Sequence, residues 1–544
     1  MFRLVWIVAA ALLLGTPAHP DDKAAGIDPI FSWATSDSPG CTVAVSHEGK
    51  LVARRAYGAA DLERTVPLNP DSVFDIGSLQ KQFVAAAVLL LVDDGRLALS
   101  DDVRKYMPEL PDYGHTITVD HLLTHTSGLR DWTGLLMFTE GSVEALSMIL
   151  RQRGLNSVPG EEFSYSNSGY VLAKEIVARV SGTTFAEFSR KRLFEALGMK
   201  STFYSSDTRE VIRNRALGYD RKAGSWKLDM LLDKDRGGGA VFSTSSDLLL
   251  WNDALTSKRL GALVSMKLEE PAVLNNGKRL TYGRGLFLDA GTDTKVLWHS
   301  GSAAGYKALL ARFPEDELSI AILCNSGDGT DRIAFARRIV DLYTGRNRED
   351  SKSDRPEAIA IPDLNNRTGL FFNEANDEPL RLIADAGRIR VAGGPALQPV
   401  NEDRFRNPTG QLSFRSGDEF ELHFRSQNEI ELKSMDGNTE RYRRARPHVH
   451  TVEEMKVLTG RYESDELKAV IDVASIKDGL SIRLNDAPDK VLELRAVERD
   501  AFQRGMMIVR FRRDAAGKVK GFDYSNPLLR NIRFTRLSES AGGR

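Results

Sequence analysis

The sequence predicts an α+β domain, built from an antiparallel sheet flanked by helices, followed by two all-β barrel domains. Two strand-like apolar runs, Cys41–Ser46 and Leu318–Cys324, bracket a long stretch of helical patterns. A charged segment with almost no apolar residues follows at 346–356 and indicates a linker. Beyond it, short alternating runs such as Phe420–Phe424 are separated by Gly, Asp and Asn turns, which is typical of antiparallel strands.

The start of the chain has the pattern of a secretory signal peptide. Arg3 gives a positive start, Leu4–Leu14 is an unbroken apolar run, and Thr16-Pro17-Ala18 offers small residues for cleavage. The apolar run is shorter than the roughly 20 residues of a spanning helix, and no later stretch is long and charge-free enough to cross a bilayer. We therefore expect a secreted protein of the bacterial periplasm with no integral membrane span after signal removal. An uncleaved anchor is the alternative.

The length of the chain and a weak internal repeat define the expected domains. A chain of 544 residues exceeds what one core usually supports. We expect a signal peptide at 1–18, the α+β domain at 27–345, a linker at 346–360, and barrels at 361–446 and 452–538. The repeat has a spacing of about ninety residues. Its pairs are Thr368–Phe372 with Thr459–Tyr462, Asp403–Phe405 with Asp500–Phe502, Leu412–Phe414 with Ile508–Phe511, and Tyr442 with Phe534. One larger sandwich is the alternative to two barrels.

Charge and cysteine content exclude several classes of protein. The 74 Lys and Arg residues nearly balance the 75 Asp and Glu residues, so there is no electrostatic case for nucleic acid. The only cysteines, Cys41 and Cys324, exclude a disulfide scaffold and any multi-cysteine metal site. We expect two buried thiols, with a disulfide as the alternative in an oxidising compartment. The sequence leaves open whether the protein forms a homo-oligomer.

The first motif is Ser78-Leu79-Gln80-Lys81, which leads into the apolar stretch Phe83–Val92 and a stop at Asp93-Asp94-Gly95. This pattern predicts a buried helix on which Ser78 and Lys81 share one face. Ser78 alone would be an ordinary helix cap. A Lys in the first turn, however, opposes the helix dipole, and burial disfavours its charged form, so Lys81 is a plausible base.

The second motif is Tyr165-Ser166-Asn167, which follows Pro159-Gly160 and precedes the helical stretch Tyr170–Val180. Taken alone, it favours a helix cap from Ser166 or Asn167. The functional interpretation is that the Tyr165 phenol, its pKa lowered by a nearby Lys, exchanges protons with a nucleophile and a leaving group. Asn167 would then offer its amide to a substrate carbonyl.

The third motif is Trp298-His299-Ser300-Gly301-Ser302, on a predicted strand whose hairpin partner is Gly305–Pro314. On a strand His299 and Gly301 point to the same side, which places a proton-handling imidazole beside bare backbone. Gly301 lets a substrate lie against the edge of the strand.

Together these motifs resemble the serine β-lactamase, penicillin-binding protein and D-aminopeptidase superfamily, in its class-C-like branch, peptidase family S12. The stretches Asp120–Leu129 and Gly237–Leu248 look like signature segments of that branch. The resemblance spans roughly residues 30 to 345 and implies a β-lactamase/transpeptidase-like fold.

The resemblance also implies a role for each motif residue in a serine hydrolase. Ser78 is the acylated nucleophile, Lys81 and Tyr165 are the proton-handling pair, and Asn167 orients the substrate. The backbone N–H groups of Ser78 and Ser302 form the oxyanion hole. The implied substrate is a small molecule, peptide or ester, and no metal or other cofactor is required.

The third motif bears on the substrate, because the superfamily often has Lys-Thr-Gly where this chain has His299-Ser300-Gly301. A Lys would attract a substrate carboxylate, whereas an unperturbed His is mostly neutral at neutral pH. The motif is similar to that of D-aminopeptidases and esterase-like members. Bacterial D-aminopeptidases also resemble this chain in carrying two lipocalin-like barrels, with a barrel loop that helps to bind the free amino terminus. Leu484–Asp489 would be that loop, through Asp486 or Asp489, although a solvent-facing hairpin tip is favoured.

Two histidines and three alternative functions complete the sequence-based expectations. His121 and His125 have a spacing that metal sites use, but they fall in a signature segment and are assigned to structure. The alternatives to a D-aminopeptidase or esterase are a β-lactamase and a D-alanyl-D-alanine carboxypeptidase. A different class is a non-catalytic receptor whose barrels bind a ligand.

Overall fold

A computed structural model of the chain describes residues 20–138, 144–207, 210–231, 239–290, 295–327, 330–345, 364–392, 394, 396–407, 420–434, 439–484 and 487–538. The predicted signal peptide (1–18) and linker (346–360) lie outside the described residues. Within the described ranges, no helix combines the length and the apolar character that crossing a bilayer requires.

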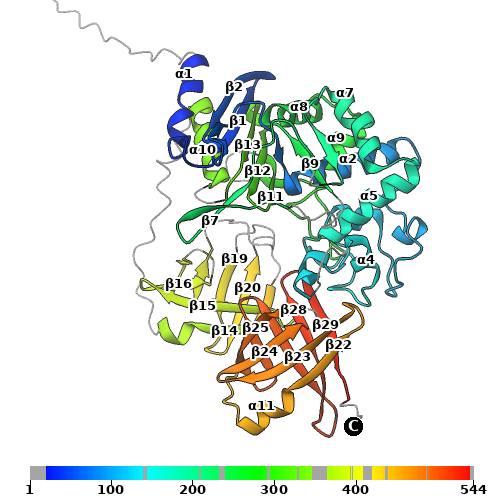
Figure 1. Ribbon diagram of the computed structural model, residues 1–544, viewed down its shortest axis with the longest axis vertical. Coiled ribbons are helices and arrows are strands. Elements are labelled where there is room, and N and C mark those ends of the chain that lie inside the picture. Colours follow the sequence, from blue (N-terminus) through cyan, green and yellow to red (C-terminus); the bar gives the residue numbers. More distant parts are fainter. Residues whose placement is uncertain are drawn as a thin grey trace, which may run out of the picture.

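A six-stranded antiparallel sheet forms the centre of the α+β domain (Figure 1). Its strands, in spatial order, are β10 (Phe287–Ala290), β11 (Lys295–Ala303), β12 (Tyr306–Phe313), β13 (Leu318–Cys324), β1 (Cys41–His47) and β2 (Lys50–Tyr57). The two strand-like runs from opposite ends of the domain, β1 and β13, are therefore direct neighbours, paired from Cys41 opposite Cys324 to His47 opposite Leu318.

Helices cover both faces of this sheet, because alternate strand residues are apolar on both sides. Val43 and Ile322 pack on one side with Phe335 and Ile339 of α10 (Arg332–Thr344). On the other side Ala44 and Leu323 join the core that includes α8 (Ser245–Thr256). The predicted α+β class, with an antiparallel sheet flanked by helices, is confirmed.

The remaining elements of this domain are short apart from two long helices. They are α1 (Pro20–Ala25), η1 (Asp28–Phe31), β3 (Ala59–Asp61), β4 (Val66–Pro67), β5 (Phe74–Asp75), η2 (Gly77–Leu79), α2 (Gln80–Asp93), η3 (Val103–Lys105), α3 (Val119–Leu123), η4 (Trp132–Phe138), α4 (Ala145–Leu150), α5 (Asn167–Ser181), α6 (Phe185–Ser189), η5 (Arg190–Phe194), α7 (Glu195–Leu197), β6 (Phe203–Ser205), β7 (Tyr219–Lys222), β8 (Ser225–Leu228), β9 (Ala240–Ser243), α9 (Ala262–Leu268) and η6 (Pro314–Asp316). The two long helices, α2 and α5, pack against each other and carry the first two motifs.

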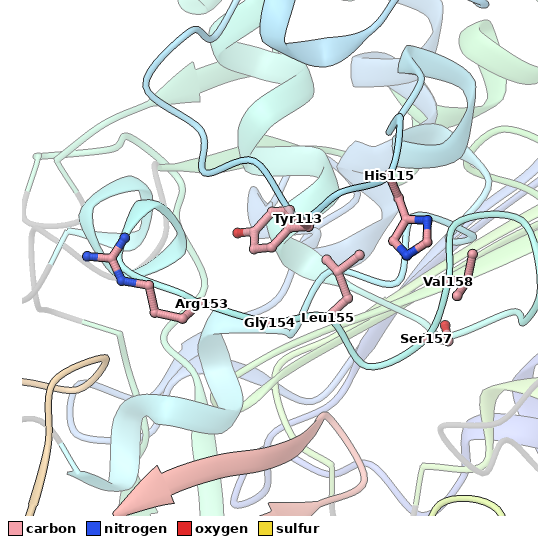
Figure 2. A pocket seen from close by; sticks show the side chains of 7 residues that line it. All are labelled: Tyr113, His115, Arg153, Gly154, Leu155, Ser157 and Val158. Atoms are coloured by element: carbon pink, nitrogen blue, oxygen red, sulfur yellow. The ribbon is translucent and has the colours of Figure 1, made fainter.

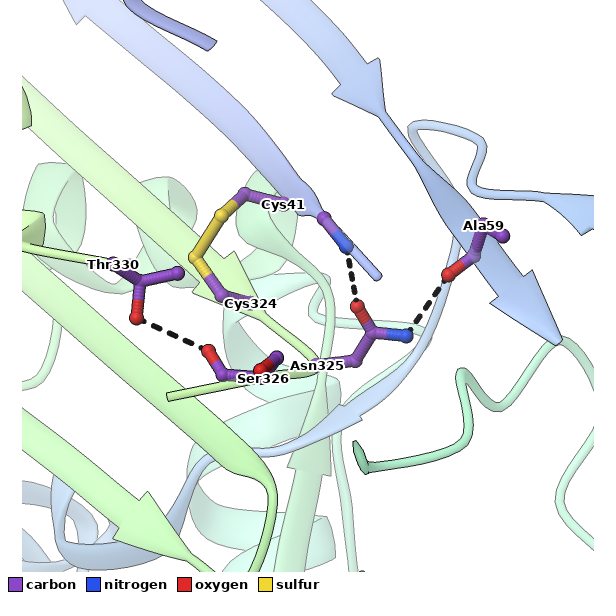
Figure 3. Close-up of a disulfide and its surroundings, with 7 residues drawn as sticks. Cys41, Ala59, Cys324, Asn325, Ser326 and Thr330 are labelled. Carbon is purple, nitrogen blue, oxygen red and sulfur yellow. Dashed lines mark hydrogen bonds between the residues drawn. A yellow bond between two sulfur atoms is a disulfide. The ribbon is translucent and has the colours of Figure 1, made fainter. Parts of the chain in front are cut away.

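Cys41 and Cys324 form a disulfide between the facing ends of β1 and β13 (Figure 3). The expectation of two buried thiols is wrong, because strand pairing places the two residues opposite each other, with Cα atoms 4.0 Å apart. The next residue, Asn325, reinforces the junction: its side chain accepts from Gly40 N at 2.8 Å and donates to Ala59 O at 3.0 Å.

The C-terminal part consists of two eight-stranded antiparallel sheets. The first contains β14 (Gly369–Asn373), β15 (Pro379–Asp385), β16 (Arg388–Val391), β17 (Gln398–Pro399), β18 (Arg404–Arg406), β19 (Phe420–Phe424), β20 (Glu429–Ser434) and β21 (Thr439–Arg444), after η8 (Leu364–Arg367). The second is a closed barrel of β22 (Gly460–Ser464), β23 (Ala469–Ile476), β24 (Gly479–Leu484), β25 (Ala487–Glu498), β26 (Ala501–Arg504), β27 (Met507–Arg513), β28 (Val519–Asn526) and β29 (Leu529–Arg536), after α11 (Val452–Leu458).

The internal repeat corresponds to this topology. The first strands β14 and β22, the fifth strands β18 and β26, and the eighth strands β21 and β29 contain the paired motifs. The sixth strands are β19 and β27, so Phe420–Phe424 is the counterpart of β27, and Leu412–Phe414 lies outside the described residues. Only the second sheet closes into a barrel; the first is an open sheet with β16 and β17 at its edges, so the prediction of two closed barrels is confirmed for the second alone. The likeness to lipocalins stays a prediction.

Aromatic and aliphatic side chains fill the interiors of both sheets. Phe371, Phe405 and Tyr442 are almost fully buried in the first, and Tyr462, Phe522 and Phe534 are fully buried in the second. Aromatic packing of this kind is typical of a protein core.

Candidate active site

Ser78 lies in the short turn η2, at the point where the chain enters the buried helix α2. Asp75 accepts a hydrogen bond from Gly77 N at 2.8 Å and so fixes the start of the turn. Gly77 has a φ of 52°, and a Cβ added there would lie 2.6 Å from Ser302 N. The turn therefore requires glycine, and it leaves Ser78 partly exposed among buried neighbours.

Lys81 is 3% exposed, and its Nζ donates to Ser78 Oγ at 3.0 Å and to Asn167 Oδ1 at 2.9 Å. Burial lowers the pKa of Lys81 to about 7; the charge of Asp131 opposes this shift and that of Lys174 adds to it. Near neutral pH a large fraction of Lys81 is therefore the free amine, which can accept a proton. The predicted face shared by Ser78 and Lys81 and the predicted pKa shift are both confirmed.

Tyr165 lies beside Lys81, whose Nζ is 4.7 Å from the centre of the Tyr165 ring. Burial raises the pKa of Tyr165 above its usual value, and the interaction with the Ser78 side chain opposes this only in part. The expectation that a nearby Lys lowers this pKa is wrong, because desolvation of the phenolate dominates. Tyr165 is thus a neutral hydroxyl at neutral pH and a proton donor.

Asn167 begins α5, and Asp131 determines how its amide is oriented. Asp131 Oδ2 accepts from Asn167 Nδ2 at 2.8 Å and from Asn167 N at 2.7 Å. The amide oxygen is thereby turned toward Lys81, and one amide N–H remains for a substrate carbonyl. Ser166 makes no capping bond with its side chain, so the ordinary cap is replaced by the carboxylate of Asp131.

The strand β11 runs directly against the turn of the nucleophile. A Cβ added at Gly301 would lie 1.9 Å from Ile76 O and 3.3 Å from Ser78 N. Gly301 is therefore required for the close approach that brings the backbone of Ser302 next to Gly77 and Ser78. The arrangement suits an oxyanion hole made of Ser78 N and Ser302 N.

His299 is 1% exposed, and both of its ring nitrogens are occupied. Nδ1 donates to Ser300 O at 2.6 Å, so Nε2 accepts from the hydroxyl of Tyr282 at 3.2 Å. Burial lowers the pKa of His299 to about 3, so the expectation of an unperturbed pKa is wrong, although the imidazole is neutral as expected. The proton-handling role of His299 stays a prediction. Its ring lies beside that of Tyr165, with ring centres 6.4 Å apart.

Sequence reasoning missed Asp131 and Lys307. Lys307 lies opposite Ser302 in the β11–β12 pairing, and its Nζ donates to Ser302 Oγ at 2.7 Å and to Ala304 O at 2.8 Å. Lys307 lies beside the proposed oxyanion hole because the hairpin register pairs it with Ser302. The sequence alone does not show this register. For Asp131 the available signal was an acidic residue two positions after the signature segment Asp120–Leu129.

The two paired histidines have structural roles, as predicted. His121 completes a capping box with Thr118 at the start of α3. His125 accepts from Ser166 N at 3.0 Å, and its ring lies 4.2 Å from that of Tyr165. Among the residues described, no group of three or more His, Cys, Asp or Glu side chains is arranged to hold a metal ion. In the suggested barrel loop, Asp486 and the side chain of Asp489 fall outside the described residues.

A surface cavity of about 320 Å³ is lined by other residues than those of the candidate active site (Figure 2). Its lining includes Tyr113, His115, Leu155 and Ser157, none of which belongs to the three motifs. The side chain of Arg153 points away from the other labelled side chains, so the cavity has no convergent set of charges.

Comparison with known proteins identifies the family. The Beta-lactamase family model matches residues 32–344, which is more than half of the chain. The chain belongs to the beta-lactamase family.

Relatives within the beta-lactamase family include peptidases and penicillin-binding proteins. A D-aminopeptidase from Brucella anthropi is 26% identical over 536 residues, which cover 92% of this chain and 95% of the relative. Penicillin-binding protein 4* from Bacillus subtilis is 30% identical over 313 residues, 53% of this chain and 69% of the relative. The structure of a D-amino acid amidase from Ochrobactrum anthropi SV3 matches 60% of this chain and 99% of its own, with 26% identity and a TM-score of 0.50. This beta-lactamase family member is therefore a serine hydrolase that acts on amide or ester bonds, which sets the receptor alternative aside.

Proposed function

We propose that this protein hydrolyses D-aminoacyl amides or esters through an acyl-enzyme on Ser78. The observation that carries the proposal is the contact of 3.0 Å between Lys81 Nζ and Ser78 Oγ, made by an amine whose pKa is lowered to about 7. A nucleophile within hydrogen-bond reach of a base of matched pKa is the arrangement that covalent catalysis requires.

Acylation follows from the positions of three side chains. Neutral Lys81 accepts the Ser78 hydroxyl proton while Oγ bonds to the substrate carbonyl carbon and the carbonyl electron pair moves to its oxygen. The N–H groups of Ser78 and Ser302 stabilise that oxyanion, an effect worth a factor of about 10²–10³ per donor. When the carbonyl re-forms, the C–N or C–O bond breaks, Tyr165 protonates the leaving group, and Lys81 returns a proton to Tyr165. Water then hydrolyses the Ser78 ester by the same proton transfers in reverse.

The preference for an aminoacyl substrate rests on the neutral His299 and on the full-length relative. Burial keeps His299 uncharged, so it offers no cation for a substrate carboxylate. The D-aminopeptidase from Brucella anthropi aligns with 92% of this chain, so the match extends beyond the α+β domain into the C-terminal sheets.

Lys307 favours a second candidate, a D-alanyl-D-alanine carboxypeptidase. Its Nζ donates to Ser302 Oγ beside the proposed oxyanion hole, where a cation would attract a terminal carboxylate. The relationship to penicillin-binding protein 4* supports the same candidate.

A substrate panel with purified protein distinguishes the candidates. We expect D-alanyl p-nitroanilide and short D-aminoacyl esters to exceed their L-isomers, nitrocefin and a peptide ending in D-Ala-D-Ala by at least tenfold in kcat/KM. Ser78→Ala is the control and is expected to lose all of these activities. Faster turnover of the D-Ala-D-Ala peptide or of nitrocefin would contradict the aminoacyl proposal. In that case Lys307→Met is expected to raise KM for carboxylate-bearing substrates.

We also propose export to the periplasm. The amino-terminal pattern of a signal peptide and the disulfide between Cys41 and Cys324 support it, because disulfides persist in oxidising compartments. Mass spectrometry of the protein from a periplasmic fraction is expected to show loss of the first 18 or so residues. An intact N-terminus in the cytoplasmic fraction would contradict the proposal.

A further inference from the structure

A bridging segment, residues Arg130–Phe138, lies between the active site and the second barrel. On the active-site side, Asp131 is fully buried and binds Asn167 through the two hydrogen bonds already described. Its other carboxylate oxygen accepts from Thr133 N and Thr133 Oγ1, both at 2.8 Å. Ser168 Oγ donates to Arg130 O at 2.8 Å, which ties the same segment to the first turn of α5. The segment therefore determines where Asn167 is held.

On the opposite side, two parts of the second barrel bind the same segment. Asp131 N donates to Leu528 O at 3.0 Å, in the turn between β28 and β29. The guanidinium of Arg130 forms a buried ion pair with Glu466, from the turn between β22 and β23, and donates to Asn531 O at 3.1 Å. Glu466 also accepts from Arg153 N at 2.8 Å. In Figure 1, β28 and β29 reach the part of the α+β domain near α4.

Close packing makes this junction continuous with the core of the barrel. The ring of Phe138 lies 4.6 Å from that of Tyr524 and 5.4 Å from that of Phe534. A Cβ added at Gly134 would lie 2.8 Å from Leu529 Cδ2, so the segment and the β28–β29 turn are in direct contact. A shift of the barrel must therefore move the bridging segment.

We propose that the second barrel is part of the proton-transfer machinery: Glu466 and the β28–β29 turn hold Arg130 and Asp131, and Asp131 orients Asn167 and thereby Lys81. Asp131 and Glu466 are positioning residues, because neither touches Ser78. The inference rests on the proposed role of Ser78 and Lys81. The second barrel then contributes to the rate of the chemical step, in addition to any contribution to substrate binding.

The physical reason lies in the two ends of the Asn167 amide. Its oxygen accepts from Lys81 only while its nitrogen donates to Asp131. If Asp131 moves, the Asn167 amide can rotate and turn its NH₂ group toward Lys81. Protonated Lys81 carries only hydrogen-bond donors, so its hydrogen bond with Asn167 would then be lost. The carboxylate also favours the charged form of Lys81. The other titratable groups around Lys81 are Tyr165, Tyr170, Lys174, His125 and His299, none of which is a carboxylate.

The test compares two glutamates of the second barrel. Glu466 pairs with Arg130, and Glu498 pairs with Arg443 of the first eight-stranded sheet and with Arg510, away from the bridging segment. The side chains of both glutamates are 10% exposed, so Glu498→Ala is a matched control for the loss of a buried, ion-paired carboxylate. Full-length variants are compared by thermal unfolding, by kcat and KM on an ester, and by the pH dependence of Ser78 labelling with a fluorophosphonate.

We expect Glu466→Ala to lower kcat and the labelling rate at least tenfold while KM changes less than threefold. The acid limb of the labelling profile is expected to shift to lower pH, because a displaced Asp131 no longer favours protonated Lys81. Asp131→Asn is expected to shift it in the same direction, and Glu466→Gln is expected to restore part of the rate. Glu498→Ala is expected to unfold at a lower temperature than the parent protein but to keep its kcat and pH profile.

Two results would overturn the inference. One is a wild-type kcat and pH profile in Glu466→Ala, and the other is an equal loss and shift in Glu498→Ala. A parent protein that hydrolyses the ester without fluorophosphonate labelling at Ser78 would instead refute the proposed function, and the inference with it.

Discussion

Gly301→Ala tests how closely the strand β11 must approach the nucleophile. The added Cβ would lie 1.9 Å from Ile76 O, whereas real Cβ contacts stay beyond 3.0 Å, so strand and turn must separate by about 1 Å. A misplacement of about 1 Å in a catalytic arrangement costs around 10²-fold in rate, or about 2.7 kcal/mol of transition-state stabilisation. We expect kcat/KM for the best ester substrate to fall at least 100-fold, mainly through kcat, because the oxyanion donors act in the transition state.

Steady-state kinetics and thermal unfolding of Gly301→Ala and of a control measure this effect. Gly394→Ala is the control, because a Cβ there would meet its nearest atom at 3.4 Å, an ordinary contact. We expect the control to match the parent protein in both measurements. A Gly301→Ala protein with parental kcat/KM would refute the proposed contact between β11 and the turn of Ser78.

Three further predictions concern Lys81 and the disulfide. Lys81→Met is expected to lower the acylation rate at least 10³-fold, because it removes the general base. The variant is expected to remain folded, because it also removes a buried charge from the apolar helix α2. Unfolding of this variant in circular dichroism would show a structural role instead. Because the pKa of Lys81 is about 7 and only the free amine accepts a proton, kcat/KM is expected to rise with pH up to about 7 and then level off; a limb at the ordinary lysine value of 10.5 would contradict this. Replacing both Cys41 and Cys324 by Ala opens a loop with a sequence separation of 283 residues, for which the chain-entropy relation gives about 5.6 kcal/mol. Denaturant unfolding is expected to show a loss approaching that value, and unchanged stability would mean that the bond does not form in the mature protein.

The sequence was sufficient for features that depend on local spacing. Ser78 and Lys81 lie three residues apart at the start of one buried helix, so their proximity follows from helix geometry. The hairpin of β11 and β12 is similarly local. By contrast, Cys41 and Cys324 meet only because β1 and β13 pair in one register. Strand pairing over such a separation leaves no periodic signal in either strand alone.

The supporting residues of the site were missed for the same reason. Asp131 looks like an ordinary acidic residue until Asn167 and Leu528 are placed around it. Glu466 lies more than 300 residues from Arg130 in sequence. The sign of the Tyr165 pKa shift was also beyond the sequence, because it depends on burial as well as on the neighbouring Lys.

The most direct test of the hydrolase mechanism is the site of covalent attachment of a fluorophosphonate. Intact-mass measurement and peptide mapping of the labelled protein are expected to find one adduct, on Ser78, formed at a rate that falls at least 10³-fold in Lys81→Met. An adduct on a different residue, or a labelling rate that does not depend on Lys81, would contradict the mechanism.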